Sequence, residues 1–265
     1  MKGETADASC FTLHVSRPFL IAWHFLTAVP LSRNGHNPEP RELAASMGWY
    51  PLVGLVLGSI LAASDLLFSR FVSDGVVAWL LIIVLVVLTR GLHQDGLADS
   101  LDGLAGGRSP SERLAIMRDG RIGAIGATGL VLALGLRYEG VMELPDDGRM
   151  ALLIAMPAVG RWAMVVGAMA APYARSEGGL AQPFLAHLSW PHLLGATLLL
   201  AVVLGWFLGP LGALVSLVLV ASVARASTAF SRRLFGGVTG DTLGATNEMA
   251  EVLFLLLGPA LFGLR

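Results

Sequence analysis

The chain has 265 residues and a formal net charge of −1; 55% of its residues are hydrophobic and only 14% are charged. Soluble domains carry about 25% charged residues, so this composition excludes an ordinary soluble protein and predicts one that crosses a membrane several times. The mean hydropathy of +0.70 agrees with that class. The single cysteine, Cys10, excludes an internal disulfide and a metal site made of cysteines alone.

In chain order, residues 1–18 are polar and lack the features of a signal peptide, so the amino terminus is expected to stay on the side where it is made. Residues 19–29 are apolar but too few to span a bilayer, which predicts an interfacial or re-entrant helix. Seven later segments are apolar enough to span, at residues 47–68, 76–89, 123–136, 151–172, 192–208, 211–229 and 248–264. The predicted fold is an all-α, polytopic transmembrane helix bundle, with residues 1–265 forming a single integral membrane domain.

Arginine placement predicts the orientation of this bundle. The segment before the first span, the stretch 90–121 and the loop after residues 232–233 are basic, whereas the loop 139–149 is acidic. Cytoplasmic loops carry the excess of Lys and Arg, and counting the spans alternately places the basic segments on one face. The amino terminus and the stretch 90–122 are therefore expected on the cytoplasmic face, and the carboxyl terminus outside.

The most informative stretch, residues 90–126, is polar and glycine-rich and lies between two apolar segments. Asp95, Asp99 and Asp102 are spaced i, i+4 and i+7, so a helix would place the three carboxylates on one face. Hard oxygen ligands at this spacing suit Mg²⁺ or Mn²⁺. Gly96 and Gly103 follow two of the aspartates and would let a substrate approach the backbone. The alternative is a solvated loop whose acids face water.

Further along, Ser109, Pro110 and Glu112 predict a capped helix of about ten residues through Met117. It leads into a glycine-rich turn that carries Arg118, Asp119 and Arg121. The two arginines and the exposed amides could bind an anion such as diphosphate. Asp119 would be a further metal ligand or the partner that orients an arginine. The alternative is a loop whose arginines only follow the positive-inside rule.

A second polar group precedes the last span and consists of Asp241, Asn247, Glu248 and Glu251. Asn247 and Glu251 are i, i+4 and share a helix face. Charges at this depth need partners, so the acids either complete a metal site or pair with Arg232 or Arg233.

Three other features of the sequence predict structural or functional roles. His93 precedes the aspartates as a candidate base or substrate contact, although a lone histidine is more often structural. Arg161 lies inside a predicted span and is expected to face the bundle interior. Residues 173–179 and the region of Gln182 form a loop that could cover a substrate.

Four motifs together resemble those of the adenosylcobinamide-GDP ribazoletransferase family, also called cobalamin (5'-phosphate) synthase. They are GLHQDGLADSLDGLAGG at residues 91–107, ERLAIMRDGRIGAIGA at 112–127, TGDTLGATNEMAE at 239–251 and YPLVGLVLG at 50–58. The resemblance implies an enzyme of the bacterial cytoplasmic (inner) membrane that joins adenosylcobinamide-GDP to alpha-ribazole or its 5'-phosphate. GMP is released, Mg²⁺ is required, no nucleic acid takes part, and an oligomer is left open.

On this resemblance, we hypothesise a role for each site residue. His93 is included among the catalytic candidates and Gly96 and Gly103 among the substrate-binding ones. We expect metal and diphosphate binding by Asp95, Asp99 and Asp102, and a further ligand or base at Asp119. The leaving GMP phosphate would be bound by Arg118 and Arg121. Second-site metal ligands would be Asp241, Asn247, Glu248 and Glu251.

Two other functions are weighed against this one. In a CDP-alcohol phosphotransferase, Asp99, Asp102 and Gly103 would match the opening DxxDG motif, but the later Ala-Arg pair falls on Gly106 and Gly107 and the closing DxxxD is absent. A cation-coupled transporter would need ionisable groups near the middle of the membrane, whereas these acids cluster at helix ends.

Overall fold

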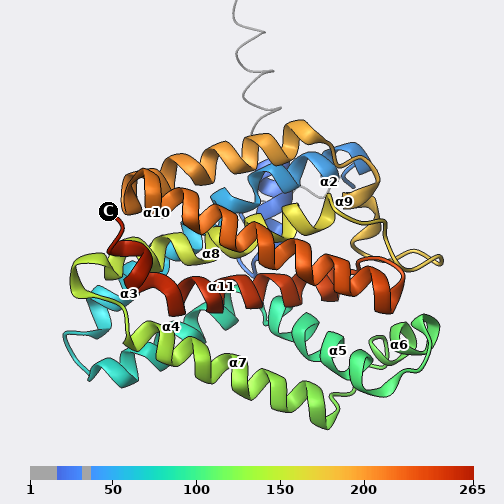
Figure 1. The fold of residues 1–265 in the computed structure, drawn as a ribbon, viewed down its shortest axis with the longest axis horizontal. Helices are drawn as coiled ribbons and strands as arrows, with labels where there is room; N and C mark the ends of the chain where they lie inside the picture. Colours follow the sequence, from blue (N-terminus) through green and yellow to red (C-terminus); the bar gives the residue numbers. More distant parts are fainter. Residues whose placement is uncertain (1–16, 32–36) are drawn as a thin grey trace, which may run out of the picture.

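The computed structural model describes residues 17–31 and 37–265, and within these ranges helices are the only extended regular elements (Figure 1). No strand occurs in the described ranges, where one isolated bridge joins Tyr173 and Val238. The predicted all-α class is therefore confirmed. The expectations on residues 1–16, which include Cys10, and on Arg33 lie outside the described residues. The elements after a first helix over residues 17–26 are α2 (Pro40–Ser46), η1 (Met47–Trp49), α3 (Tyr50–Phe68), α4 (Asp74–Thr89), α5 (Leu92–Gly106), α6 (Pro110–Ile116), α7 (Ala124–Met142), α8 (Asp146–Ala168), α9 (Gln182–Ala186), α10 (Trp190–Phe235) and α11 (Gly240–Phe262).

Five helices in the described chain are long and apolar enough to cross a membrane, and six if the bent pair α4 and α5 forms one broken span. Two of the seven predicted spans, residues 192–208 and 211–229, both lie in α10. This helix has 46 residues and breaks at Gly209, whose φ of 71° and ψ of 172° are not helical. Figure 1 shows α10 folding back on itself there, because Pro210 follows and cannot continue the preceding hydrogen-bond ladder.

The helix α8 forms the centre of the bundle, and close packing around it depends on small residues. Cβ atoms added at Gly54 and Gly58 of α3 would collide with the backbone of α8 at Ala158 and Ile154. The two glycines therefore let α3 and α8 approach each other closely. The first helix also packs into the core, since Ala22 and Leu26 are fully buried. The first helix is therefore part of the packed bundle and does not only lie on its surface.

A sharp bend between α4 and α5 places the polar helix against the bundle. The two helices meet at 89°. Arg90 and Gly91 both have left-handed backbone conformations, with φ of 54° and 65°. Arg90 is a strained position for a residue with a side chain, and its guanidinium donates to the carbonyl of Thr27 at 3.0 Å. This bend turns the aspartates of α5 toward α7 and α11.

Candidate active site

Most of the polar residues that were predicted to form the site lie at one end of the bundle. Figure 1 shows α5, α6, the amino-terminal ends of α7 and α11, and the loop between α8 and α9 together at the right-hand end. The helix α5 packs against both α7 and α11. Residues from separate parts of the sequence therefore meet here, including both predicted acidic groups.

Four aspartates and one arginine, which we call the aspartate cluster, form the accessible part of this end. Asp99 lies within electrostatic reach of Asp95, Asp102, Asp241 and Arg175. Asp95 is exposed, and Asp99 and Asp241 are partly exposed. Four carboxylates beside one guanidinium leave a surplus of negative charge, which favours a bound cation.

Arg175 is the cluster member that the sequence did not reveal. It belongs to the loop after α8, and its Nη2 donates to Oδ2 of Asp241 at 2.8 Å. Asp241 lies in the first turn of α11, where Thr239 is the N-cap and its hydroxyl accepts from the amide of Thr242. Because of this cap, α11 begins at Gly240 rather than near residue 248, where the predicted span begins.

Asp102 lies in the cluster but its carboxylate holds another helix. One oxygen accepts from the amide of Gly123 at 2.6 Å and the other from the amide of Gly126 at 2.8 Å. These amides are at the start of α7, where N–H groups lack partners inside the helix. Cβ atoms at either glycine would collide with the carboxylate of Asp102. The geometry therefore gives Asp102 a capping role beside its predicted metal role, which stays a prediction.

The two glycines of α5 that were predicted to contact substrate, Gly96 and Gly103, face protein rather than open space. A Cβ at Gly96 would lie 2.7 Å from the carbonyl oxygen of Asp241, and one at Gly103 would lie 2.7 Å from Cγ of Met117. The glycines thus let α11 and α6 pack closely on α5. Their predicted contact with substrate stays a prediction, and the geometry supplies a packing reason for both.

The predicted capped helix forms as α6, but it ends at Ile116 and its cap differs in one bond. The hydroxyl of Ser109 accepts from the amide of Glu112 at 3.3 Å, as expected. The carboxylate of Glu112 instead accepts from the amide of Arg108 at 2.9 Å, one residue before the N-cap. In an ideal capping box this carboxylate would accept from the amide of the N-cap residue itself, so one of the two bonds of the box is shifted by one residue.

The glycine-rich turn after α6 carries two exposed ion pairs. Arg121 donates to Asp119 through two bonds of 3.0 and 2.5 Å, and Arg118 donates to Glu177 at 2.7 Å. Each guanidinium lowers the pKa of its carboxylate partner by hydrogen bonding to the ionised form. Asp119 is thus paired with an arginine, one of its two predicted roles. The pair of Arg118 and Glu177 connects this turn to the loop that carries Arg175.

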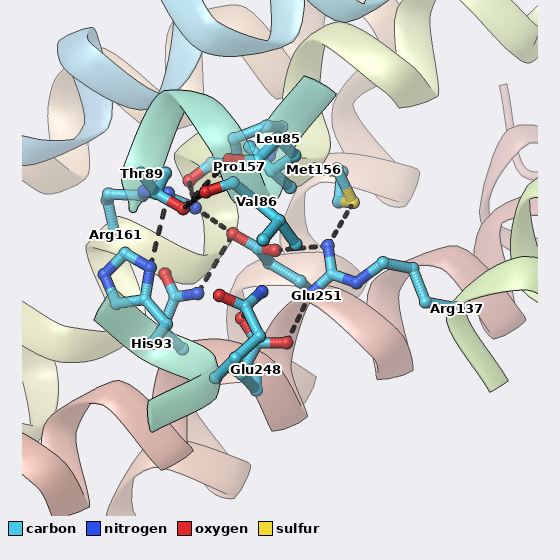
Figure 2. Close-up of polar contacts among 12 residues, drawn as sticks. Leu85, Val86, Thr89, His93, Arg137, Met156, Pro157, Arg161, Glu248 and Glu251 are labelled. Atoms are coloured by element: carbon cyan, nitrogen blue, oxygen red, sulfur yellow. Dashed lines mark hydrogen bonds and ion pairs between the residues drawn. The ribbon is translucent and has the colours of Figure 1, made fainter. Parts of the chain in front are cut away.

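Below the cluster, a buried network joins two glutamates of α11 to two arginines (Figure 2). Arg137 of α7 donates to Glu248 at 2.7 Å and to Glu251 at 2.6 Å. Arg161 of α8 forms a very short ion pair with Glu251. All four side chains are at most 2% exposed. Two positive and two negative charges balance, which satisfies the requirement that buried charges be paired.

Amide side chains complete the network, which we call the arginine–glutamate network. Gln94 donates to Oε1 of Glu248 at 3.0 Å, and Asn247 donates to Oε1 of Glu251 at 3.1 Å. Every carboxylate oxygen of the two glutamates therefore accepts at least one hydrogen bond. Arg161 faces the bundle interior as expected. The partners of the glutamates are Arg137 and Arg161, and neither of the predicted partners, Arg232 and Arg233, pairs with them.

His93 joins the network at its edge. Nη2 of Arg161 lies 3.5 Å from Nδ1 of His93, which is only 1% exposed. An arginine can donate hydrogen bonds but cannot accept them, so Nδ1 is the acceptor and the ring proton lies on Nε2. Such a histidine presents an N–H donor. This geometry argues against the base that the sequence suggested and favours the substrate contact.

The chemistry of the donors decides which acids fit a divalent cation. In the described chain no three His, Cys, Asp or Glu side chains form a ready-made set of metal ligands. Mg²⁺ usually takes only one or two protein carboxylates and fills its other positions with water and phosphate oxygens. Asp95 and Asp99, accessible and close to a third carboxylate of Asp241, fit that requirement. Glu248 and Glu251 do not fit, because their oxygens are already occupied by donors.

Comparison with known proteins gives a consistent result. The family model described as cobalamin-5-phosphate synthase matches residues 18–258. The chain is 44% identical over 216 residues to an adenosylcobinamide-GDP ribazoletransferase of Syntrophobacter fumaroxidans, covering 82% of this chain and 87% of that protein. It is 41% identical over 255 residues to a protein of the same name from Pseudomonas putida, covering 92% and 98%.

A third protein of that name, from Desulforamulus reducens, is 38% identical over 239 residues, covering 89% of this chain and 94% of its own length. No solved structure matches the chain. The family model spans the aspartate cluster, the arginine–glutamate network and nearly all of the helices. The chain belongs to the cobalamin-5-phosphate synthase family.

Proposed function

We propose that the chain joins adenosylcobinamide-GDP to alpha-ribazole or its 5'-phosphate. A ribose hydroxyl attacks the phosphorus attached to cobinamide, the bond from that phosphorus to the GMP oxygen breaks, and GMP leaves. The hydroxyl proton passes to a carboxylate of the protein. The products are GMP and adenosylcobalamin or its 5'-phosphate. The family match favours this transfer over the CDP-alcohol phosphotransferase, whose motif the chain matches only at its opening, and over the transporter.

The observation that carries the proposal is the aspartate cluster beside Arg175. Displacement at a diphosphate depends mainly on charge neutralisation and positioning. A bound Mg²⁺ or Mn²⁺ would neutralise the diphosphate oxygens and polarise the reacting phosphorus. Asp95 and Asp99 are the residues that would hold it, with Asp241 as the third carboxylate nearby. Arg175 would leave Asp241 for a phosphate oxygen of the substrate.

The exposed arginines have a supporting role in this proposal. Arg118 and Arg121 lie in the turn after α6, and Arg118 is paired with the loop of Arg175. Their guanidinium groups would hold the leaving GMP phosphate when the loop between α8 and α9 covers the substrates. Asp241, the carboxylate that the metal would not take, also lines the cavity beside the cluster and would receive the hydroxyl proton.

We further propose that this end of the bundle faces the cytoplasm of a bacterium, across its inner membrane. The basic residues of the stretch 90–121 support this orientation by the positive-inside rule. Both proposed substrates are charged and water-soluble, so an active site at a helix end is accessible to them.

The test is GMP release by the purified full-length protein in lipid nanodiscs. With adenosylcobinamide-GDP, alpha-ribazole 5'-phosphate and Mg²⁺, we expect GMP and adenosylcobalamin 5'-phosphate in equal amounts. Omitting either substrate, or chelating the divalent cation with EDTA, is expected to stop release, and added Mg²⁺ or Mn²⁺ to restore it. Release that continues without the ribazole substrate would contradict the transfer, and release that survives EDTA would contradict the metal.

A further inference from the structure

A mainly apolar cavity opens beside the aspartate cluster. Its volume is about 110 Å³, and its apolar wall includes Phe25, Tyr50, Met164 and Phe184. These residues come from the first helix, α3, α8 and α9, so the cavity lies where four helices meet. The ring centroids of Phe25 and Phe184 are 4.5 Å apart, and those of Phe25 and Tyr50 are 6.3 Å apart. Aromatic walls of this kind favour a flat, apolar ligand.

His93 contributes a buried hydrogen-bond donor to this cavity. It is one of the lining residues, and its Nε2 has no partner among the described residues. Figure 2 shows the ring with Nδ1 toward Arg161 and the other nitrogen directed away from the arginine–glutamate network. The contact with Arg161 places the proton on Nε2. An unsatisfied buried donor costs free energy, so a ligand with an acceptor atom at this point is favoured.

The cavity therefore favours a ligand with a flat apolar ring system and a hydrogen-bond acceptor. The base of a ribazole is dimethylbenzimidazole, which is flat, mainly apolar and lacks N–H donors. One ring nitrogen carries the ribose and the other has a free lone pair. Guanine fits less well because its two donor groups would be buried against apolar side chains. A corrinoid ring is several times larger than a benzimidazole, so the smaller base suits this cavity better.

We propose that this cavity binds the benzimidazole base of the ribazole substrate and that Nε2–H of His93 donates to the free ring nitrogen. This inference rests on the proposed transfer for the identity of the ligand. Asp95 and Asp241 line the same cavity. A base held against the aromatic wall would direct its ribose toward the carboxylates, where the attacking hydroxyl is needed. His93 is then a specificity-determining residue, and the proton acceptor is a carboxylate.

The experiment measures equilibrium binding by calorimetry on the full-length protein in lipid nanodiscs. The two probes are alpha-ribazole 5'-phosphate and the analogue in which the free ring nitrogen is replaced by C–H, giving a dimethylindole. We expect the indole analogue to bind about 10- to 100-fold more weakly, because the donor of His93 stays unsatisfied. Since the change is made on the ligand, misfolding of a variant cannot produce it.

Two variants locate the effect in the cavity. In His93→Phe, which keeps an aromatic ring, the two probes are expected to bind within about 3-fold of each other, because the donor is gone. In Phe184→Ala both probes are expected to bind more weakly by a similar factor, because the aromatic wall contacts the ring faces. Wild-type protein that binds both probes equally, or neither, would overturn the proposal.

GMP release measured with the same two probes separates this inference from the proposed function. GMP release from ribazole phosphate together with equal binding of the two probes would keep the transfer and reject the base site. A binding difference that depends on His93, with no GMP release, would keep the base site and reject the transfer.

Discussion

Arg175 donates a hydrogen bond of 2.8 Å to Asp241, and this pair joins the loop after α8 to the first turn of α11. The two residues are 66 positions apart in the sequence. Together they are the point where the loop over the site contacts the aspartate cluster. A guanidinium in this place can exchange a carboxylate for a phosphate oxygen without losing a charged partner.

Arg175→Ala is expected to lower kcat/KM for GMP release by about 10- to 100-fold, because a hydrogen bond to a charged group is worth about 1.5–3 kcal/mol. Arg175→Lys should recover only part of the loss, since an ammonium lacks the planar fork of arginine. The matched control is Arg233→Ala, an exposed arginine outside the cluster, which should keep wild-type kinetics. Equal activity of Arg175→Ala and this control would remove Arg175 from the site.

Asp102→Ala is expected to lower the free energy of unfolding by about 1–3 kcal/mol, because the amides of Gly123 and Gly126 lose their acceptor. Asp102→Asn keeps one carbonyl oxygen and should lose less. Thermal unfolding in detergent without divalent cation measures this effect apart from catalysis. Asp95→Ala, an exposed aspartate of the same helix, is the control and should leave the unfolding midpoint nearly unchanged. A thermally normal Asp102→Ala would show that the cap contributes nothing.

The arginine–glutamate network predicts strong coupling between its members. Arg137→Met is expected to cost about 3–5 kcal/mol of stability, because it leaves a buried glutamate without its partner. The double variant Arg137→Met with Glu248→Gln restores charge balance and should cost less than the sum of the single variants. Unfolding midpoints of the two single variants and the double variant measure the coupling.

The control for the network is Arg17→Met. Arg17 and Glu42 form an ion pair of 3.0 Å, but half of the arginine side chain is exposed. Breaking such a pair should cost less than about 1 kcal/mol. Costs of similar size for Arg137→Met and Arg17→Met would contradict the account of a paired, buried network.

Much of the site could be predicted from local sequence pattern. The spacing of Asp95, Asp99 and Asp102 predicts one helical face, and α5 is a helix over all three. Polarity within an apolar chain identified the stretch 90–126 and the group at 241–251, and the structure brings Asp95, Asp99 and Asp241 together. These predictions succeed because they depend on helix periodicity and on the cost of charge near a membrane.

The partners could not be predicted, because they depend on which helices meet. Asp102 shares a face with Asp95 on α5, yet its carboxylate reaches the start of α7. The predicted span 123–136 ended one residue before Arg137, which the longer α7 buries against Glu248 and Glu251. A charged residue directly after an apolar segment reads as a loop residue until the opposite charge on another helix is known.

The role of a glycine in packing could not be predicted from the sequence either. A glycine beside an aspartate suggested room for a substrate, but Gly96 gives room to the backbone of α11 at Asp241. Gly160 similarly makes room for Asn247 and Glu251, because a Cβ there would lie 2.6 Å from Oδ1 of the asparagine. The sequence shows where a side chain is missing, and only the packing shows what occupies the space.

The most direct test of the aspartate cluster compares Asp99→Asn with Asp147→Asn in the GMP release assay with both substrates and Mg²⁺. Asp147 is exposed in the first turn of α8, at the other end of the bundle (Figure 1). We predict that Asp99→Asn lowers kcat at least about 100-fold, which corresponds to about 3 kcal/mol of lost interaction with a charged group. We predict that Asp147→Asn keeps wild-type turnover. Equal turnover of the two variants would contradict the role of the cluster in the transfer.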